Sequence, residues 1–161
     1  MDEISSREAN APEELLKDLV ANWQDGRIKL HLIRKALNFR LAHKELFAAG
    51  EYIPLEVVGQ RPDSIVAFGR HRRKDWLMVA VPRLVAGTFR RRKSLLHRAN
   101  WPALKVILPR KCPLRWRNIF TSSSVSARPG RDGQIELPLS GMLDKFPCVL
   151  LEPEAEKSPA R

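Results

Sequence analysis

The chain changes character within one stretch of sequence, which reads Asp25-Gly-Arg-Ile-Lys-Leu-His-Leu-Ile-Arg-Lys-Ala-Leu-Asn-Phe-Arg-Leu-Ala-His-Lys-Glu-Leu-Phe47 and, after two alanines, Gly50-Glu-Tyr-Ile-Pro-Leu-Glu-Val-Val-Gly59. Up to Phe47 the apolar residues recur at three- and four-residue steps, which is the period of a helix. After Gly50 they fall into short runs broken by proline, glycine and charge, which is typical of strands. The stretch therefore predicts a long helix that leads directly into a β-rich region.

The predicted helix is apolar on two faces. One face is a stripe of four aliphatic residues, and the other is a mixed set on the far side; the stripe is Leu30, Ile33, Leu37 and Leu41, and the far set is Ile28, Leu32, Phe39 and Leu46. A helix with two apolar faces requires cover on both. We expect the stripe to pack on the first strands of the β region, and an upstream helix from about Pro12 to Trp23 to be a candidate cover for the second face. Asp25 is expected to cap the long helix by accepting hydrogen bonds from backbone N–H groups two or three residues on.

Seven strands are predicted after Gly50, at residues 52–58, 64–70, 76–81, 104–108, 124–127, 134–137 and 148–151. Their spacing favours an antiparallel sandwich. Pro54 should make its strand either an edge strand or a bulged one, and the sequence from Arg128 to Gly133 predicts a hairpin turn. The predicted fold class is therefore α+β, with N-terminal helices at residues 1–48, an antiparallel β-sandwich at 49–151 and a flexible tail at 152–161.

Charge is distributed unevenly along the chain. The net charge is +11, from 29 basic and 18 acidic residues, and residues 64–131 contain 17 Lys and Arg against the single acid Asp75. Such a field attracts polyanions. However, no helix-turn-helix, RNP-like or zinc-finger pattern organises the basic residues for contact with bases. Nucleic-acid binding is therefore an alternative hypothesis and not the preferred one.

The sequence contains no recognisable catalytic or metal-binding pattern. His31 and His43 share the predicted helix but stand twelve residues apart, too far to hold one ligand. There is no Gly-x-Ser-x-Gly elbow and no glycine-rich phosphate loop. Cys112 and Cys148 lack the spacing of metal ligands, which favours a reducing compartment. We therefore predict no catalytic residue, no metal and no cofactor.

Targeting signals are also absent from the sequence, while the tryptophans give one candidate site. The acidic N-terminus is unlike a signal peptide, and no apolar run approaches the roughly 18 residues that a membrane helix needs, so a cytoplasmic protein without membrane contact is expected.

Trp101 and Trp116 stand in loop-like sequence and are candidate stacking platforms for a sugar ring. Trp23 and Trp76 are expected to be core or interface anchors instead.

Several short motifs follow one another in a characteristic order. They are Glu14-Leu15-Leu16 and Trp23 ahead of Asp25-Gly26; Val66-Ala67-Phe68; the run from Leu77 to Val81 with Pro82-Arg83; Val106-Ile107-Leu108-Pro109; Trp116-Arg117-Asn118-Ile119-Phe120-Thr121; and Phe146-Pro147-Cys148-Val149-Leu150-Leu151. In this order they resemble the C-terminal region of the maltooligosyl trehalose synthases, members of the α-amylase superfamily. The resemblance covers residues 13 to 151 and is weakest between 85 and 100, where Arg90-Arg91-Arg92-Lys93 is more charged than the family pattern.

The resemblance implies that the long helix is the last helix of a catalytic barrel and that the sandwich is the amylase-type domain C. The family reaction is an intramolecular transglucosylation that gives a maltodextrin a trehalosyl end, in trehalose biosynthesis, without a cofactor. A (β/α)8 barrel takes about 250 residues, and no position here corresponds to the family's catalytic carboxylates. The chain alone is therefore expected to be a noncatalytic structural or docking domain. Its expected partner is a separate catalytic barrel polypeptide, and it would meet maltodextrin only through that partner.

The sequence leaves several alternatives to this interpretation. The docking domain is either a truncated gene product or one piece of a split enzyme, and an independent module is left open as well. An accessory glucan-binding module is one further function, and a polyanion-binding protein is another.

Overall fold

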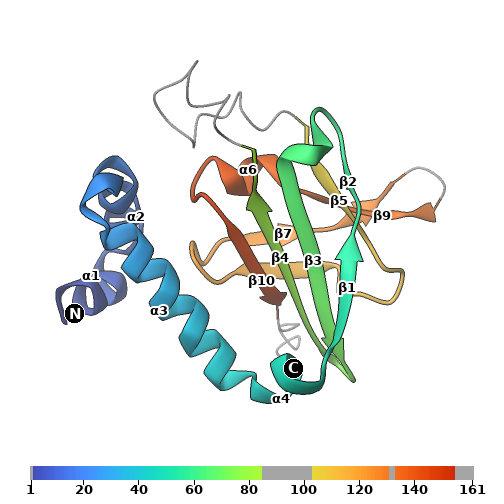
Figure 1. Cartoon of the computed structure of the whole chain (residues 1–161), viewed down its shortest axis with the longest axis horizontal. Helices are drawn as coiled ribbons and strands as arrows, with labels where there is room; N and C mark the ends of the chain where they lie inside the picture. The colour runs from blue at the N-terminus through green and yellow to red at the C-terminus, as the bar shows by residue number, and fades with distance from the viewer. Residues whose placement is uncertain (1, 85–102, 131–132, 155–161) are drawn as a thin grey trace, which may run out of the picture.

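The computed structural model describes residues 2–84, 103–130 and 133–154, and it places a group of helices beside a two-sheet sandwich (Figure 1). The helical region contains α1 (Asp2–Asn10), α2 (Pro12–Ala21), the short 3-10 helix η1 (Trp23–Asp25), α3 (Arg27–Ala42) and α4 (Lys44–Ala49). α2 and α3 occupy the stretches predicted to be helical. α1 was not predicted.

The start of α3 is set by Asp25 and Gly26. Oδ1 of Asp25 accepts a hydrogen bond from the backbone N–H of Arg27 at 2.8 Å, two residues on as predicted, but the N-cap position of α3 belongs to Gly26, and Asp25 is the last residue of η1. Gly26 precedes the helix with φ of 81°, in the left-handed region that glycine adopts without steric cost. These two residues therefore turn the chain from η1 into α3.

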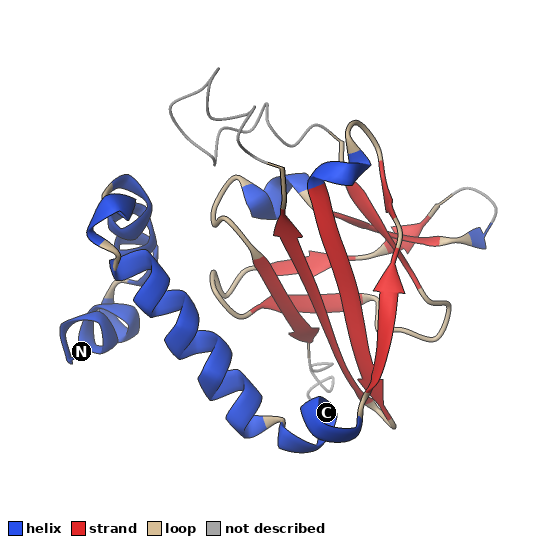
Figure 2. Cartoon of the chain, in the orientation of Figure 1, coloured by secondary structure: helices blue, strands red, loops and turns tan. Residues whose placement is uncertain are grey.

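The β region consists of two antiparallel sheets, as predicted (Figure 2). The larger sheet has the order β1-β3-β4-β10-β6-β7, with strands β1 (Glu51–Leu55), β3 (Ile65–Arg72), β4 (Asp75–Pro82), β10 (Val149–Pro153), β6 (Arg115–Asn118) and β7 (Ser124–Ser126). The smaller sheet has the order β2-β5-β9-β8, with strands β2 (Val57–Val58), β5 (Lys105–Leu108), β9 (Ile135–Pro138) and β8 (Arg128–Pro129). Two short helices, η2 (Pro62–Ser64) and α6 (Ser140–Leu143), complete the described elements. The fold class is α+β.

Two local predictions about the sheets are confirmed. Pro54 lies in the edge strand β1, opposite Phe68 of β3. β8 and β9 form the predicted hairpin, in which the N–H of Gly130 donates to the carbonyl of Gln134 at 2.7 Å. The first predicted strand, at 52–58, is divided: β1 belongs to the larger sheet and β2 to the smaller one.

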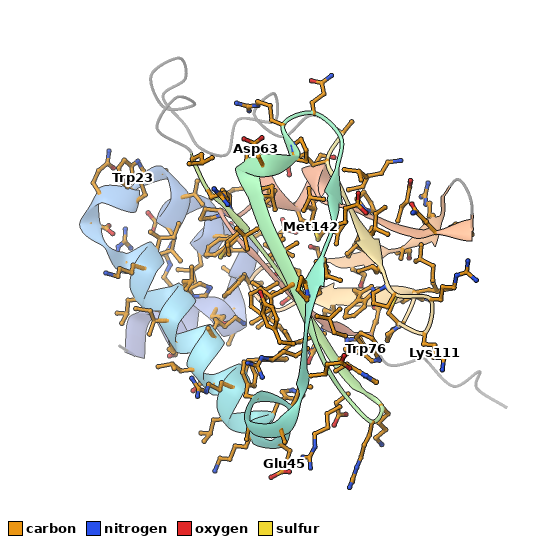
Figure 3. All side chains as sticks on the ribbon, turned by 45° about the vertical axis from the view of Figure 1, so that its right-hand side comes forward. Trp23, Glu45, Asp63, Trp76, Lys111 and Met142 are labelled. Atoms are coloured by element: carbon orange, nitrogen blue, oxygen red, sulfur yellow. The ribbon has the colours of Figure 1, made fainter. Side chains whose placement is uncertain are left out.

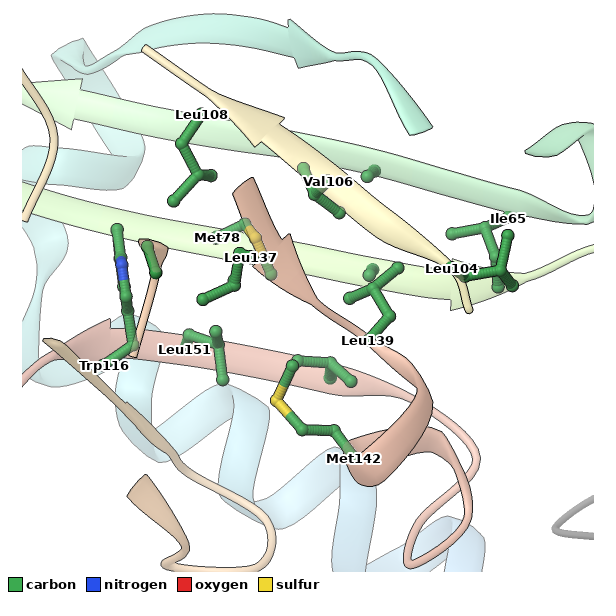
Figure 4. Close-up of a cluster of buried hydrophobic side chains, with 14 of the residues drawn as sticks. Ile65, Met78, Leu104, Val106, Leu108, Trp116, Leu137, Leu139, Met142 and Leu151 are labelled. Carbon is green, nitrogen blue, oxygen red and sulfur yellow. The ribbon is translucent and has the colours of Figure 1, made fainter. Parts of the chain in front are cut away.

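The main core lies between the two sheets (Figure 4). Side chains from the larger sheet, such as Met78 and Leu151, meet Val106 and Leu137 of the smaller sheet, all of them 0–1% exposed. Removing apolar surface of this kind from water is the dominant favourable contribution to folding. α6 contributes Met142, which Figure 4 shows beside Leu139 and Leu151.

A second apolar cluster lies on the outer face of the larger sheet, where α3 and α4 cover it. Phe39 and Leu46 from the helices pack in this cluster with Leu77, Phe146 and Leu150. Alternate residues of a strand face opposite sides of a sheet, so Leu77 belongs to this cluster while Met78 belongs to the main core. Because both faces of the sheet are covered, β4 and β10 are apolar on both faces.

The face of α3 that packs on the sheet is opposite to the one predicted. Phe39 is 7% exposed, whereas Leu37 and Leu41 are 57% and 62% exposed. The prediction that the Ile33, Leu37 and Leu41 stripe packs on the sandwich is therefore wrong. The buried face has an aromatic ring, which removes more apolar area from water than one aliphatic side chain, and α4 extends that face with Leu46.

The predicted tail boundary also needs correction. Glu152 and Pro153 belong to β10, where Glu152 lies opposite Arg117 and Pro153 opposite Trp116 of β6. The strand continues because β6 offers it a hydrogen-bonding edge, which the polar sequence of this segment does not reveal. Residues 155–161 lie outside the described part of the chain.

Candidate functional site

Of the two predicted sugar platforms, Trp116 is not available to a ligand. It lies on β6 in the main core and is 1% exposed, so neither face of its ring is open to a sugar. The sequence Arg115-Trp-Arg-Asn118 alternates outward and inward side chains, which is a strand pattern, so the loop expected around Trp116 is a strand. Trp101 lies outside the described residues.

The other two tryptophans also differ in exposure. Trp76 is buried in the main core at 8% exposure, as expected of an anchor. Trp23 is 55% exposed at the outer end of the helical region, so it is not an anchor within this chain (Figure 3).

The basic middle of the chain is partly neutralised by acids from elsewhere in the sequence. Arg72 pairs with Glu45 of α4, Arg117 with Glu152 of β10, and Lys105 with Glu136 at 2.5 Å. The folded chain thereby brings carboxylates next to a segment that has almost none of its own. The run from Arg90 to Lys93 lies outside the described residues.

The apolar stripe predicted on α3 is the largest exposed apolar feature of that helix. Its residues Leu30, Ile33, Leu37 and Leu41 are 40–62% exposed. They lie on the side of α3 away from Phe39, roughly 180° around a helix of 3.6 residues per turn. A contiguous exposed apolar surface on a surface helix is typical of an interaction site.

The stripe continues into a shallow groove where α3 meets α4. The groove has a volume of about 370 Å³ and is lined by Leu37, Leu41, Phe47 and Ala48 together with Arg40 and Lys44. The guanidinium carbon of Arg40 lies 5.8 Å from the centre of the Phe47 ring. The floor of the groove is therefore apolar and its edge is cationic.

The charges on this face are all of one sign. α3 contains five Lys and Arg and no acid. Three of these cations are paired with acids from outside the helix: Arg27 with Asp18 and Asp25, and both Arg34 and Lys35 with Glu8. Lys29 and Arg40, and Lys44 of α4, are exposed and have no acidic partner among the described residues. We refer to Leu30, Ile33, Leu37 and Leu41 with these three cations as the docking face.

The ion pairs on the opposite flank hold α1 and α2 against α3. Asp18 accepts from Arg27 at 3.0 Å and from Arg7 at 2.7 Å, and these bonds hold its pKa well below the ordinary range. Burial alone would raise the pKa of Glu8, but the hydrogen bonds and charges of Lys35 and Arg34 outweigh burial and lower it. Both carboxylates are therefore charged at neutral pH.

His31 lies inside this flank and has no hydrogen-bonding partner among the described residues. It is 1% exposed, and neither Nδ1 nor Nε2 is satisfied. Burial lowers the pKa of His31, and the charge of Glu8 opposes that effect only in part. Nothing in the sequence around His31 distinguishes it from His43, so the sequence alone assigns it no role.

The described residues form no metal site, and their two cysteines are not activated. No three His, Cys, Asp or Glu side chains come together there in a way that could hold a metal ion. Cys112 and Cys148 are buried free thiols, and burial raises their pKa values to about 11 and about 12. Over the same ranges, every helix is too short or too polar to cross a bilayer.

Comparison of the chain with protein-family models, with curated proteins and with solved structures gives no significant match. Its function is therefore inferred from the sequence and from the arrangement of its residues.

Proposed function

We propose that this chain is a noncatalytic docking domain, whose docking face on α3 binds a catalytic barrel of the maltooligosyl trehalose synthase type. The observation that carries the proposal is the two-faced character of α3. Phe39 and its neighbours pack on the sandwich, while the Leu30 to Leu41 stripe is exposed on the opposite side. A helix at the edge of a single domain needs only one apolar face, so a second one favours a second body.

The size of the docking face fits a helix packed against another domain. The stripe extends over eleven residue steps of α3, or about 16 Å at 1.5 Å per residue. Stable interfaces bury about 800 Å² on each partner, which is more than four aliphatic side chains supply. The groove beside Phe47 and the stems of Arg40 and Lys44 would therefore take part in the contact.

The charge of the face favours a barrel over a second copy of this chain. In a symmetric dimer built on α3, Lys29, Arg40 and Lys44 of one copy would approach the same cations of the other, and like charges at an interface are costly. A partner with an apolar centre and an acidic rim avoids this repulsion. The resemblance to the C-terminal region of maltooligosyl trehalose synthases favours a barrel as this partner, because in that family the corresponding helix belongs to the barrel.

The noncatalytic part of the proposal is supported by how the carboxylates are used. Glycoside chemistry requires two carboxyl groups that face each other across the substrate, within about 10 Å. Glu8, Asp18, Glu136 and Glu152 are instead engaged in ion pairs with Arg and Lys. The purified chain alone is therefore expected to leave maltohexaose unchanged.

The test is reconstitution with the catalytic barrel of a maltooligosyl trehalose synthase produced without its own C-terminal region. We expect the two polypeptides to co-elute in size-exclusion chromatography and the mixture to convert maltohexaose into a nonreducing product. The double variant Leu37→Ser/Leu41→Ser should weaken the complex at least tenfold. Its melting temperature should stay close to that of the parent, because both side chains are already exposed.

A matched control is Leu114→Ser, since Leu114 is 50% exposed and lies outside the docking face. Equal binding of the parent and the double variant would refute the docking face. Self-association through α3 at micromolar concentration would refute the choice of partner. Conversion of maltohexaose by the chain alone, lost on mutation of one of its own acids, would refute the noncatalytic proposal.

A further inference from the structure

The connection between α2 and α3 displays an exposed tryptophan. Trp23 begins η1 and is 55% exposed, and every residue from Ala21 to Gly26 is exposed. A tryptophan that is fully buried removes about 150–250 Å² from water, so an exposed one leaves much favourable contact unused. Trp23 therefore contributes little to the packing of this chain and has a large surface to offer to another molecule.

Several hydrogen bonds hold this connection in one conformation. The backbone N–H of Asp25 donates to the carbonyl of Asn22 at 3.0 Å. Nδ2 of Asn22 donates to Oδ1 of Asp18 at 2.7 Å, and the same carboxylate accepts from Arg27 at 3.0 Å. A side chain displayed from a fixed backbone loses less conformational entropy on binding than one displayed from a loose loop. Trp23 is therefore pre-organised for contact with a partner.

Trp23 lies at one end of the docking face, at the outer end of the helical region (Figure 3). The N–H of Gly26 donates to the carbonyl of Trp23 at 3.4 Å, and the N–H of Leu30 donates to the carbonyl of Gly26 at 3.2 Å. These two bonds place Trp23 and Leu30 about two helical turns apart, or roughly 12 Å. A Cβ added at Gly26 would meet no atom within 4 Å, so the surface beside this residue is open.

The docking face is small for a stable interface without this residue. Its four aliphatic side chains are only 40–62% exposed, whereas a standard interface buries about 800 Å² on each partner. The exposed half of Trp23 adds roughly 80–140 Å² if a whole tryptophan buries about 150–250 Å². Tryptophan is also among the residue types most enriched at the few positions that dominate binding energy.

The chemistry around Trp23 indicates the kind of pocket that fits it. The indole has an apolar body and one N–H donor, for which no acceptor is found among the described residues. Lys29, in the first turn of α3, is exposed and belongs to the cations of the docking face. A pocket with apolar walls, a carbonyl or carboxylate acceptor and an acidic rim is complementary to all three features.

We propose that Trp23 is the anchor of the docking interface and inserts into an apolar pocket with an acidic rim on the partner protein. This inference rests on the proposed docking function and adds to it the residue that dominates the binding energy and the pocket that the partner must supply. An anionic lipid surface also receives exposed tryptophan and lysine side chains. A fluid surface gains little from a fixed side chain, however, so the hydrogen-bonded turn under Trp23 favours a protein pocket.

The first experiment measures, by calorimetry, how variants of the full chain bind the catalytic barrel of a maltooligosyl trehalose synthase produced without its own C-terminal region. Trp23→Ala should weaken the complex about thirtyfold or more, which is the loss typical of a dominant interface residue. Trp23→Phe keeps a ring but loses the N–H, so it should weaken the complex about three- to tenfold, as the loss of one hydrogen bond does. Tyr52→Ala is the matched control and should bind as the parent does, because Tyr52 is 52% exposed on β1, outside the docking face.

A second experiment detects the contact of Trp23 itself. The chain is labelled with 5-fluorotryptophan, and the 19F resonance of Trp23 is assigned by its loss in Trp23→Phe. Addition of unlabelled barrel should shift this resonance and leave those of Trp76 and Trp116 in place, because both are buried in the main core. Vesicles of equimolar phosphatidylglycerol and phosphatidylcholine at physiological salt should leave all three unshifted.

Each outcome bears on one part of the proposal. Equal binding of the barrel by the parent and by Trp23→Ala would overturn the anchor, while the docking function would stand. Absence of any complex with the barrel would overturn both. A saturable shift of the Trp23 resonance on the vesicles, without barrel, would overturn the protein pocket in favour of a lipid surface.

Discussion

The two faces of α3 predict opposite responses to the same kind of truncation. Phe39 is 7% exposed and its ring contacts those of His43 and Phe47, at centroid distances of 4.2 Å and 6.2 Å. Truncation of a buried Phe to Ala typically costs about 3–5 kcal/mol, because the transfer free energy is lost and a cavity is left behind. Phe39→Ala should therefore lower the free energy of unfolding by about 3 kcal/mol or more.

Leu37 lies on the docking face and should respond weakly. It is 57% exposed, so less than half of its side chain is removed from water on folding. Complete burial of a Leu is worth about 1.5–3 kcal/mol, and the buried fraction of Leu37 therefore sets an upper bound of about 1.3 kcal/mol for Leu37→Ala. The higher helix propensity of Ala offsets a few tenths of a kcal/mol of this loss.

Urea denaturation followed by tryptophan fluorescence measures both variants, since Trp76 and Trp116 are buried in the main core. With a slope of about 2 kcal/mol per molar urea, Phe39→Ala should shift the midpoint by about 1.5 M and Leu37→Ala by less than about 0.5 M. If Leu37→Ala costs more than about 2 kcal/mol while Phe39→Ala costs less than about 1 kcal/mol, the orientation of α3 is wrong. The docking face would then be buried in the isolated chain.

Three further predictions concern pH, thiols and polyanions. Burial holds the pKa of His31 below its ordinary value of 6.5, so below about pH 6.5 the unfolded chain binds more protons than the folded one. The stability contributed by neutral His31 is thus fully present above about pH 7 and is lost on acidification. The variant His31→Gln should lose less stability than the parent between about pH 7.5 and 5.5. An unchanged loss of stability would show that other groups cause it. Burial raises the pKa of Cys112 to about 11 and that of Cys148 to about 12, so a thiol reagent at about pH 8 should modify them far more slowly in the native protein than in urea; equal rates would contradict their burial. Because part of the basic middle is paired with acids, nonspecific DNA binding should be weak and vanish between about 50 and 200 mM salt. Submicromolar, sequence-selective binding at physiological salt would instead make polyanion binding the leading function.

Features that depend on a few neighbouring residues were predictable from the sequence. Asp25 accepts a hydrogen bond at the start of α3 because its carboxylate reaches an N–H only two residues on, although Gly26 holds the N-cap position. Pro54 lies in an edge strand because it lacks an N–H for a second neighbour. The hairpin between β8 and β9 follows from a proline and two glycines within six residues. Each of these outcomes is decided by local sterics or by one local hydrogen bond.

Tertiary packing alone decided which of these elements contact one another. It thereby also decided where the candidate sites lie. The sequence shows that α3 is apolar on two sides but not which side the sandwich covers; the structure buries the face with Phe39, which leaves the Leu37 side exposed. Trp116 was predicted to be a sugar platform and is core, because β6 is a strand only when β10 and β7 pair with it. The burial of His31, without a hydrogen-bonding partner among the described residues, likewise depends on tertiary packing. The elements around it are α1, α2 and the turn after β6, which are brought together over more than a hundred residues of sequence. Hydrophobic attraction has no direction, and the hydrogen-bonding edge of a sheet can pair with any strand that fits it. Which faces pack and which strands pair is therefore determined by the whole fold and cannot be predicted from any single segment.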